Sequence, residues 1–277
     1  MDSLYIIRAV FTTPDDFEKG IVMLTTLIPI VKEAGRLFAR AHLSRSQIQK
    51  KPGTANFVTE YDLSTQRFLK NALSSAVPGA SFMGEEDADA HLSDGLCFIV
   101  DPIDGTTNFM RSLSCSMVSV ALAQEKQVRY AVLYNPYTDE LFTAEAGGSA
   151  FLNGHPIQVS RRPLGDGIVV FGTAPYYREL TPALFSKLPA VLERCLDLRR
   201  SGSSCFDLCN VAAGRTEFFF EMMLSPWDYA AGSLLIREAG GIVTDGAGNL
   251  PSLSQNSPLY CGNPAVYAQL APILGIN

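Results

Sequence analysis

Residues 100–109 read VDPIDGTTNF and directly follow the apolar run LCFI at 96–99. Two carboxylates, Asp101 and Asp104, therefore stand where a buried strand is expected to end. Pro102 fixes the backbone between them, so both side chains can face one cup. Buried like charges repel each other unless a cation neutralises them. This stretch predicts a ligand site rather than an ordinary turn.

Acidic side chains recur in the same context elsewhere in the chain. Each stands at the end of an apolar run or at the start of a helical pattern: Glu85, Asp101, Asp104 and Asp228. Oxygen-only ligands suit Mg²⁺, Ca²⁺ or Mn²⁺ rather than zinc. Gly105, Thr106 and Thr107 then begin a helix, whose first N–H groups are a seat for a phosphate. Taken alone, Asp228 would serve equally well as a helix cap.

The composition excludes several classes of protein. The 277 residues are 47% hydrophobic and 18% charged, which allows a large core, and the net charge is −6. An acidic chain without a basic run predicts no binding to nucleic acid or to an anionic membrane. The apolar run at 21–31 is too short to span a bilayer and contains Pro29, so we predict a core helix. The six cysteines form no CxxC pair, which favours a reducing, cytoplasmic compartment and packing roles for Cys205 and Cys209.

The first part of the chain predicts a sheet covered by two helices. Helical patterns occupy 17–42 and 63–76, and the second is expected to be capped by Asp62 or Ser64. Short β runs follow between 81 and 160, and they predict an antiparallel sheet.

Beyond Pro163, strand and helix patterns alternate, which predicts an α/β half with crossover helices. We therefore place an α+β half at residues 1–163 and an α/β half at residues 164–277, joined near 161–167. The predicted fold is a layered sandwich of these α+β and α/β halves.

An ordered set of motifs resembles one known family. GEED at 84–87, DPIDGTTNF at 101–109 and PWDYAAG at 226–232 are similar to the three signature motifs of the inositol monophosphatase family. Further matching segments follow in the same order and spacing at 56–62, 134–160 and 238–248. The resemblance implies the sugar-phosphatase type of layered fold and a magnesium-dependent phosphomonoesterase.

The resemblance also implies a set of metal ligands. Glu85, Asp101 and the carbonyl oxygen of Ile103 would hold the first Mg²⁺. Asp101, Asp104 and Asp228 would hold the second, so that Asp101 bridges the two. A loosely held third ion would contact Glu85, and Mn²⁺ is an alternative metal.

Further roles follow from the same resemblance. The attacking water would be positioned by Glu85 and Thr106, with Asp62 bonded to the Thr106 hydroxyl. Lys51 matches a family lysine near the site, with Lys50 as the second choice. The phosphate would lie at Gly105 and Thr106, and the rest of the substrate would contact Asp104, Ser203, Ser204, Glu221 and Asp228.

The implied substrate is a small polyol or sugar phosphate, with inositol-1-phosphate as first choice and a homodimer as the expected assembly. Ser204 stands where the family often has alanine, so fructose-1,6-bisphosphate and histidinol phosphate stay open. A non-catalytic binding or regulatory protein is a further alternative. Glu221 could instead be a strand-end charge paired with an arginine. Four arginines could each clamp a dianion or simply be solvated or paired: Arg199, Arg200, Arg215 and Arg237.

Overall fold

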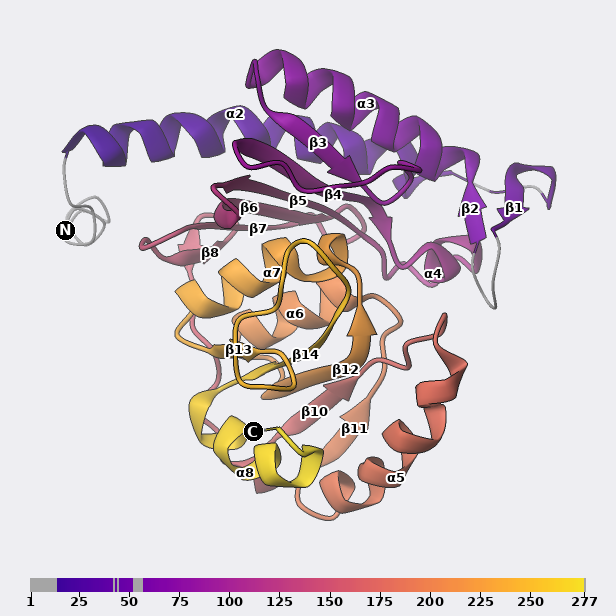
Figure 1. Ribbon diagram of the computed structural model, residues 1–277, viewed down its shortest axis with the longest axis vertical. Coiled ribbons are helices and arrows are strands. Elements are labelled where there is room, and N and C mark those ends of the chain that lie inside the picture. Colours follow the sequence, from indigo (N-terminus) through magenta and orange to yellow (C-terminus); the bar gives the residue numbers. More distant parts are fainter. Residues whose placement is uncertain (1–13, 42, 44, 52–56, 277) are drawn as a thin grey trace.

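The computed structural model describes residues 14–41, 43, 45–51 and 57–276. Two large sheets alternate with layers of helices, so the predicted layered sandwich is confirmed (Figure 1). The first outer layer contains α2 (Pro14–Ala39) and α3 (Glu60–Ala76). The central layer, between the two sheets, contains α6 (Ser204–Ala212) and α7 (Pro226–Glu238). The second outer layer contains α5 (Thr181–Leu192) and α8 (Pro264–Leu274). The predicted long helix continues through Pro29. The first residue of the matching segment at 56–62 lies outside the described residues.

α3 begins earlier than the sequence predicted. The Thr59 hydroxyl accepts hydrogen bonds from the N–H groups of Tyr61, at 3.1 Å, and Asp62, at 3.3 Å. The Asp62 carboxylate accepts the Thr59 N–H at 2.7 Å, which completes a capping box. The prediction of Asp62 or Ser64 as the cap was therefore wrong, because an equally good cap residue stands one turn earlier.

The N-terminal sheet runs in the order β3-β4-β5-β6-β7-β8-β9. Its strands are β3 (Ser81–Gly84), β4 (Leu96–Asp104), β5 (Met117–Gln124), β6 (Gln127–Asn135), β7 (Glu140–Glu145), β8 (Ala150–Leu152) and β9 (His155–Pro156). β3 pairs with β4 in parallel, so the prediction of an antiparallel sheet holds only for the remaining pairs. A separate hairpin joins β1 (Ile48–Lys50) to β2 (Phe57–Thr59).

A β-bulge lies at the end of β4. Asp101 pairs with Ser119 and Asp104 pairs with Met117, so β4 has one more residue than β5 over this interval. Such a bulge re-aims the side chains around it, and a proline fits there because no ladder hydrogen bond is needed from its nitrogen. Pro102 occupies the bulge, which explains how two carboxylates three residues apart come to serve one site.

The C-terminal sheet runs in the order β11-β10-β12-β14-β13. Its strands are β10 (Ile168–Phe171), β11 (Asp197–Arg199), β12 (Phe218–Leu224), β13 (Ile242–Thr244) and β14 (Ser257–Gly262). β14 was not predicted from the sequence, although it lies inside the sheet between β12 and β13. Its signal was masked by Pro258, which sits opposite a bulge of β12 between Glu221 and Leu224.

One core joins the two halves of the chain. Leu133 of the N-terminal sheet and Cys261 of the C-terminal sheet belong to the same buried cluster as Leu208 and Leu235 of the central helices. Cys205 and Cys209 also belong to this cluster, as their predicted packing role requires. The division at residue 163 stays a prediction. No helix among the described residues is long and apolar enough to cross a membrane.

Candidate active site

A cavity of about 790 Å³ lies where the ends of β4, β10 and β12 approach the starts of α4 (Thr106–Met110), α6 and α7. Every residue predicted for the site lines this cavity except Asp62, which contacts a lining residue, and the second-choice Lys50. Residues from both sheets contribute, so the cavity exists only because the two halves pack together.

A group of carboxylates lines the cavity. Oxygens of Asp101, Asp104 and Asp228 all lie within 4.8 Å of one another. Burial raises the pKa of Asp101 well above its ordinary value, and the charges of Glu85 and Asp104 raise that pKa further. Burial likewise raises the pKa of Glu85, and the charge of Glu86 adds to the effect. Buried, mutually repelling oxygen donors fit a hard divalent cation, which would relieve both penalties.

The bulge and the turn after it organise the first of these carboxylates. The Ile103 N–H donates to Asp101 Oδ1 at 3.0 Å, which fixes the carboxylate beside its own backbone. The Thr106 hydroxyl lies within hydrogen-bond distance of Asp62 Oδ1, at 3.0 Å, and of the Ile103 carbonyl oxygen, at 3.2 Å. Gly105 has φ of 83°, and a Cβ there would lie 3.0 Å from the Cys115 carbonyl oxygen. Glycine is therefore required for the chain to turn into α4.

Asp104 is held by the start of α6. It accepts hydrogen bonds from the hydroxyls of Ser203 and Ser204 and from the Cys205 N–H, the last at 3.0 Å. Burial raises the pKa of Asp104, and these donors oppose the rise. The two serine hydroxyls thus orient a carboxylate of the cluster, and their predicted contact with substrate stays a prediction.

Asp228 is both a helix cap and a member of the carboxylate group, the two roles that its sequence position allowed. It accepts the Ser225 N–H at 2.7 Å and completes the capping box of α7, and it is also a member of the carboxylate group. Trp227 packs against the central core and also borders the cavity.

Glu221 lies on β12 and is only 6% exposed. It accepts the Ala174 N–H at 2.7 Å, and burial raises its pKa to about 7. Arg200 lowers this pKa through its charge, yet Glu221 forms no ion pair among the described residues. The structure therefore does not support the alternative that Glu221 is a strand-end charge paired with an arginine.

Lys51 borders the cavity, and its ammonium lies 2.5 Å from Glu86 Oε2. The other oxygen of Glu86 is buried and has no partner within the described chain. Lys51 rather than Lys50 therefore has access to the site.

One part of the cavity wall was not predicted from the sequence. Thr173, Pro175, Tyr176, Tyr177 and Arg178 follow β10 and line the cavity. A cluster of aromatic and basic residues at a strand end was the available signal. Asp207 was also missed, although it lies one helical turn beyond Ser203 on α6.

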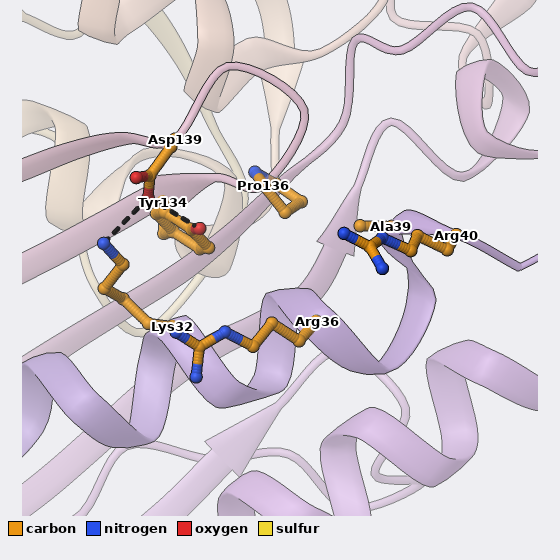
Figure 2. Close-up of a pocket in the computed structure, with 7 residues that line it drawn as sticks. All are labelled: Lys32, Arg36, Ala39, Arg40, Tyr134, Pro136 and Asp139. Atoms are coloured by element: carbon orange, nitrogen blue, oxygen red, sulfur yellow. Dashed lines mark hydrogen bonds and ion pairs between the residues drawn. The ribbon is translucent and has the colours of Figure 1, made fainter.

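A second cavity of about 410 Å³ lies between α2 and the β6–β7 hairpin (Figure 2). Lys32 pairs with Asp139 at 2.7 Å, and its ammonium lies 5.2 Å from the centre of the Tyr134 ring. Arg36 pairs with Glu33 on the same helix. This cavity holds no group of converging carboxylates and does not resemble a catalytic centre.

An acidic cluster in a cavity lined by residues of both sheets has the oxygen ligands that a metal-dependent phosphatase requires. Residues 22–275 match the model of the inositol monophosphatase family, and the chain belongs to this family. It is an enzyme that acts on small phosphate esters.

Several individual proteins are similar to the chain. The inositol-1-monophosphatase of Rhizobium meliloti is 38% identical over 256 residues, which cover 91% of this chain and 96% of that protein. The Nus factor SuhB of Escherichia coli K12 is 34% identical, covering 88% of this chain and 92% of its own. The crystal structure of the suhB suppressor protein of Bartonella henselae superposes with a TM-score of 0.83 at 35% identity, covering 91% and 98% of the two chains.

Proposed function

We propose that the protein hydrolyses a small polyol phosphate, with inositol-1-phosphate as the first candidate, and that Mg²⁺ is its cofactor. The convergence of Asp101, Asp104 and Asp228 within 4.8 Å carries this proposal. A relative named inositol-1-monophosphatase, 38% identical over nearly its whole length, supports the choice of substrate.

The residues present suit two or three divalent ions. Glu85, Asp101 and the Ile103 carbonyl would hold one ion, and Asp101, Asp104 and Asp228 would hold another, with a third near Glu85. Mn²⁺ would suit the same oxygen donors. When bound, such ions make water more acidic and neutralise charge on the leaving oxygen. A protein with a net charge of −6 can in this way accept a phosphate dianion.

Thr106 and Asp62 supply the orientation of the attacking water. Because the Thr106 hydroxyl donates to Asp62 Oδ1 at 3.0 Å, a lone pair on its oxygen is available to accept a hydrogen bond from water. A proton that leaves the water can pass through this hydroxyl to Asp62. Glu85 is the second acceptor for the same water. Gly105 and Thr106, at the start of α4, would hold the phosphate oxygens.

Glu221 is proposed to bind the alcohol part of the substrate. Its carboxylate lines the cavity and does not belong to the group of three aspartates, and among the described residues the Ala174 N–H is the backbone donor that it accepts. A polyol hydroxyl can donate to its remaining lone pairs. Fructose-1,6-bisphosphate and histidinol phosphate are alternatives that need the same chemistry.

A non-catalytic binding role has weaker support. A binding protein gains nothing from buried carboxylates that repel one another, whereas metal-assisted hydrolysis requires them. Relatives that are named Nus factor SuhB keep the binding alternative in view. The homodimer and the cytoplasmic location stay predictions.

The direct test is phosphate release by purified protein with Mg²⁺ from inositol-1-phosphate, fructose-1,6-bisphosphate, histidinol phosphate and adenosine 3′,5′-bisphosphate. Asp104→Asn should lower kcat by orders of magnitude while the protein stays folded. Asp94→Asn is the matched control, because Asp94 is exposed and pairs only with Lys126 in the described structure. Release from none of the four esters would refute the proposal, and normal turnover of Asp104→Asn would refute the assignment of the metal site.

A further inference from the structure

Cations dominate the lining of the second cavity, the space of about 410 Å³ between α2 and the β6–β7 hairpin. Figure 2 shows three of them along α2, facing side chains of the hairpin: Lys32, Arg36 and Arg40 on one side, and Tyr134, Pro136 and Asp139 on the other. Asp139 is the one carboxylate of this lining, so three positive charges stand against one negative charge. The chain as a whole carries −6, and the cavity therefore reverses the sign of the protein locally.

The spacing of the cations is not explained by the stability of the helix. Positions 32, 36 and 40 are four residues apart, and like charges at this spacing repel each other on one helix face. The helix dipole favours cations at the C-terminal end, which accounts for Arg36 in the last turn and for Arg40 directly after it. It does not account for Lys32, which lies about two turns before the end of α2. An anion held between the three side chains would relieve their repulsion.

The protein neutralises these cations only in part. Lys32 pairs with Asp139 at 2.7 Å, and Arg36 pairs with Glu33 at 2.9 Å. The side chains of Asp139 and Glu33 are 71% and 50% exposed, and ion pairs of such exposed groups are weak and easily exchanged. Arg40 forms no ion pair with a carboxylate of the described chain.

Both walls of the cavity are fixed by packing. A Cβ on Gly35 would lie 2.7 Å from Tyr134 Cδ1, so the backbone of α2 lies directly against this ring. The Tyr134 hydroxyl donates to Asp139 Oδ1 at 2.9 Å. The Asn153 amide donates to the Asp139 carbonyl oxygen at 3.2 Å, and its oxygen accepts the Leu141 N–H at 2.9 Å. The space between helix and hairpin therefore belongs to the fold itself and does not need a ligand to form.

We propose that this cavity is a second binding site, separate from the active site, for a small phosphate monoester. The planar guanidinium groups of Arg36 and Arg40 offer paired N–H donors that match phosphate oxygens, and Lys32 adds a further cation. A volume of about 410 Å³ is in the lower part of the range for small-molecule sites, and it leaves room for an organic part beside one phosphate group. Inorganic phosphate carries the same oxygens and is the other source of this chemistry. The inference does not depend on the proposed phosphatase function.

The test is isothermal titration calorimetry of the full chain in chelator, with glycerol 3-phosphate and inorganic phosphate as probes. Without a divalent metal, the carboxylates of the active-site cavity repel an anion, so binding reports on the cationic cavity. We expect wild type to bind glycerol 3-phosphate more tightly than inorganic phosphate. Arg36→Ala and Arg40→Ala should each raise the Kd for both probes roughly tenfold, the scale of a charged hydrogen bond. Arg36→Lys and Arg40→Lys should recover part of the loss because the charge remains.

Three matched variants separate this site from general attraction by positive charge. Ala39→Leu keeps all three cations but narrows the cavity that Ala39 lines, and it should weaken glycerol 3-phosphate more than inorganic phosphate. Arg199→Ala removes one exposed cation that lines neither cavity, and it should bind as wild type does. Arg200→Ala should also bind as wild type does. Of the four arginines that the sequence offered as dianion clamps, Arg200 is the one that lines the active-site cavity.

Each result has one meaning. The site is refuted if wild type binds neither probe, or if Arg36→Ala and Arg40→Ala bind both probes as wild type does. Loss of binding in Arg200→Ala, with binding kept in Arg36→Ala, would place the probes in the active-site cavity and also refute the site. An equal loss in Arg199→Ala would show attraction by charge alone. Equal affinity of wild type for the two probes, lost in the arginine variants, would overturn the monoester and assign the cavity to inorganic phosphate.

Discussion

Replacing Asp62 by asparagine should separate catalysis from stability at the start of α3. In the wild type, Asp62 Oδ2 accepts the Thr59 N–H at 2.7 Å and the Thr59 hydroxyl at 2.5 Å, and Oδ1 accepts the Thr106 hydroxyl at 3.0 Å. An asparagine amide has one accepting oxygen and one donating nitrogen. The oxygen is expected to face the two donors of Thr59, and the nitrogen then faces Thr106.

This exchange reverses the hydrogen bond to Thr106. The Thr106 oxygen would accept from the amide, and its hydrogen would turn to the Ile103 carbonyl oxygen, at 3.2 Å. The amide then occupies one of the two lone pairs of this oxygen and competes with the attacking water, and no carboxylate remains to receive a proton. Loss of general acid–base assistance lowers kcat by roughly 10²- to 10⁴-fold. We expect a loss on this scale with inositol-1-phosphate.

The effect on stability should be small. A hydrogen bond to a charged group contributes roughly 1 kcal/mol more than one to a neutral group, so asparagine weakens the bonds to Thr59. Burial, however, raises the pKa of Asp62, which means that the site disfavours the carboxylate relative to a neutral group. The two effects oppose each other, and the free energy of unfolding should change by about 1 kcal/mol or less.

Thr59→Ala is the matched control with the opposite expected outcome. It removes the cap hydroxyl of α3 and should cost about 0.5–2 kcal/mol, while the bond from Thr106 to Asp62 remains. Phosphate release and urea unfolding would be measured for both variants. Near-normal turnover of Asp62→Asn, or an equal loss of turnover in Thr59→Ala, would refute the catalytic role of the Asp62–Thr106 pair and leave a capping role only.

Three further outcomes are expected. A Cβ on Gly172 would lie 1.8 Å from Glu221 Oε2, so Gly172→Ala should displace this carboxylate. Both Gly172→Ala and Glu221→Gln should lower kcat/KM for polyol phosphates by roughly tenfold. A normal kcat/KM would show that Glu221 does not contact substrate. Mg²⁺ should raise the melting temperature of wild type and raise it less in Asp101→Asn, and a flat wild-type titration would contradict the metal site. Because burial raises the pKa of Glu221 from 4.5 to about 7, the folded state binds the proton more tightly, and stability is lost as pH rises through this interval. In chelator, wild type should therefore lose up to about 3 kcal/mol relative to Glu221→Gln between these pH values, and a constant difference in urea titrations would refute the shift.

Local patterns in the sequence predicted the elements that carry the carboxylates. The apolar run before Asp101, the proline after it and the glycine at position 105 each act on their immediate neighbours, so the end of the strand and the turn after it can be recognised from a few residues, whereas the bulge is visible only in the pairing with β5. Local patterns were not sufficient at β14. Its proline has no N–H to donate, which argues against a central strand, and only the pairing with β12 shows that no hydrogen bond is needed at this position.

The sequence by itself determined which residues could act as oxygen ligands and that they stand at strand ends and helix starts. Only the tertiary structure decided that Ser203 and Ser204 hold Asp104 from about a hundred positions away and that Asp228 is a helix cap as well as a member of the cluster. It also decided that Arg200 borders the cavity while Arg199 pairs with Asp197. Hydrogen bonds and charge pairs of this kind depend on distances in space, which are set when the two sheets close over the central helices. Neighbouring residues in the chain carry no signal for them, because the packing that brings the partners together is a property of the whole fold.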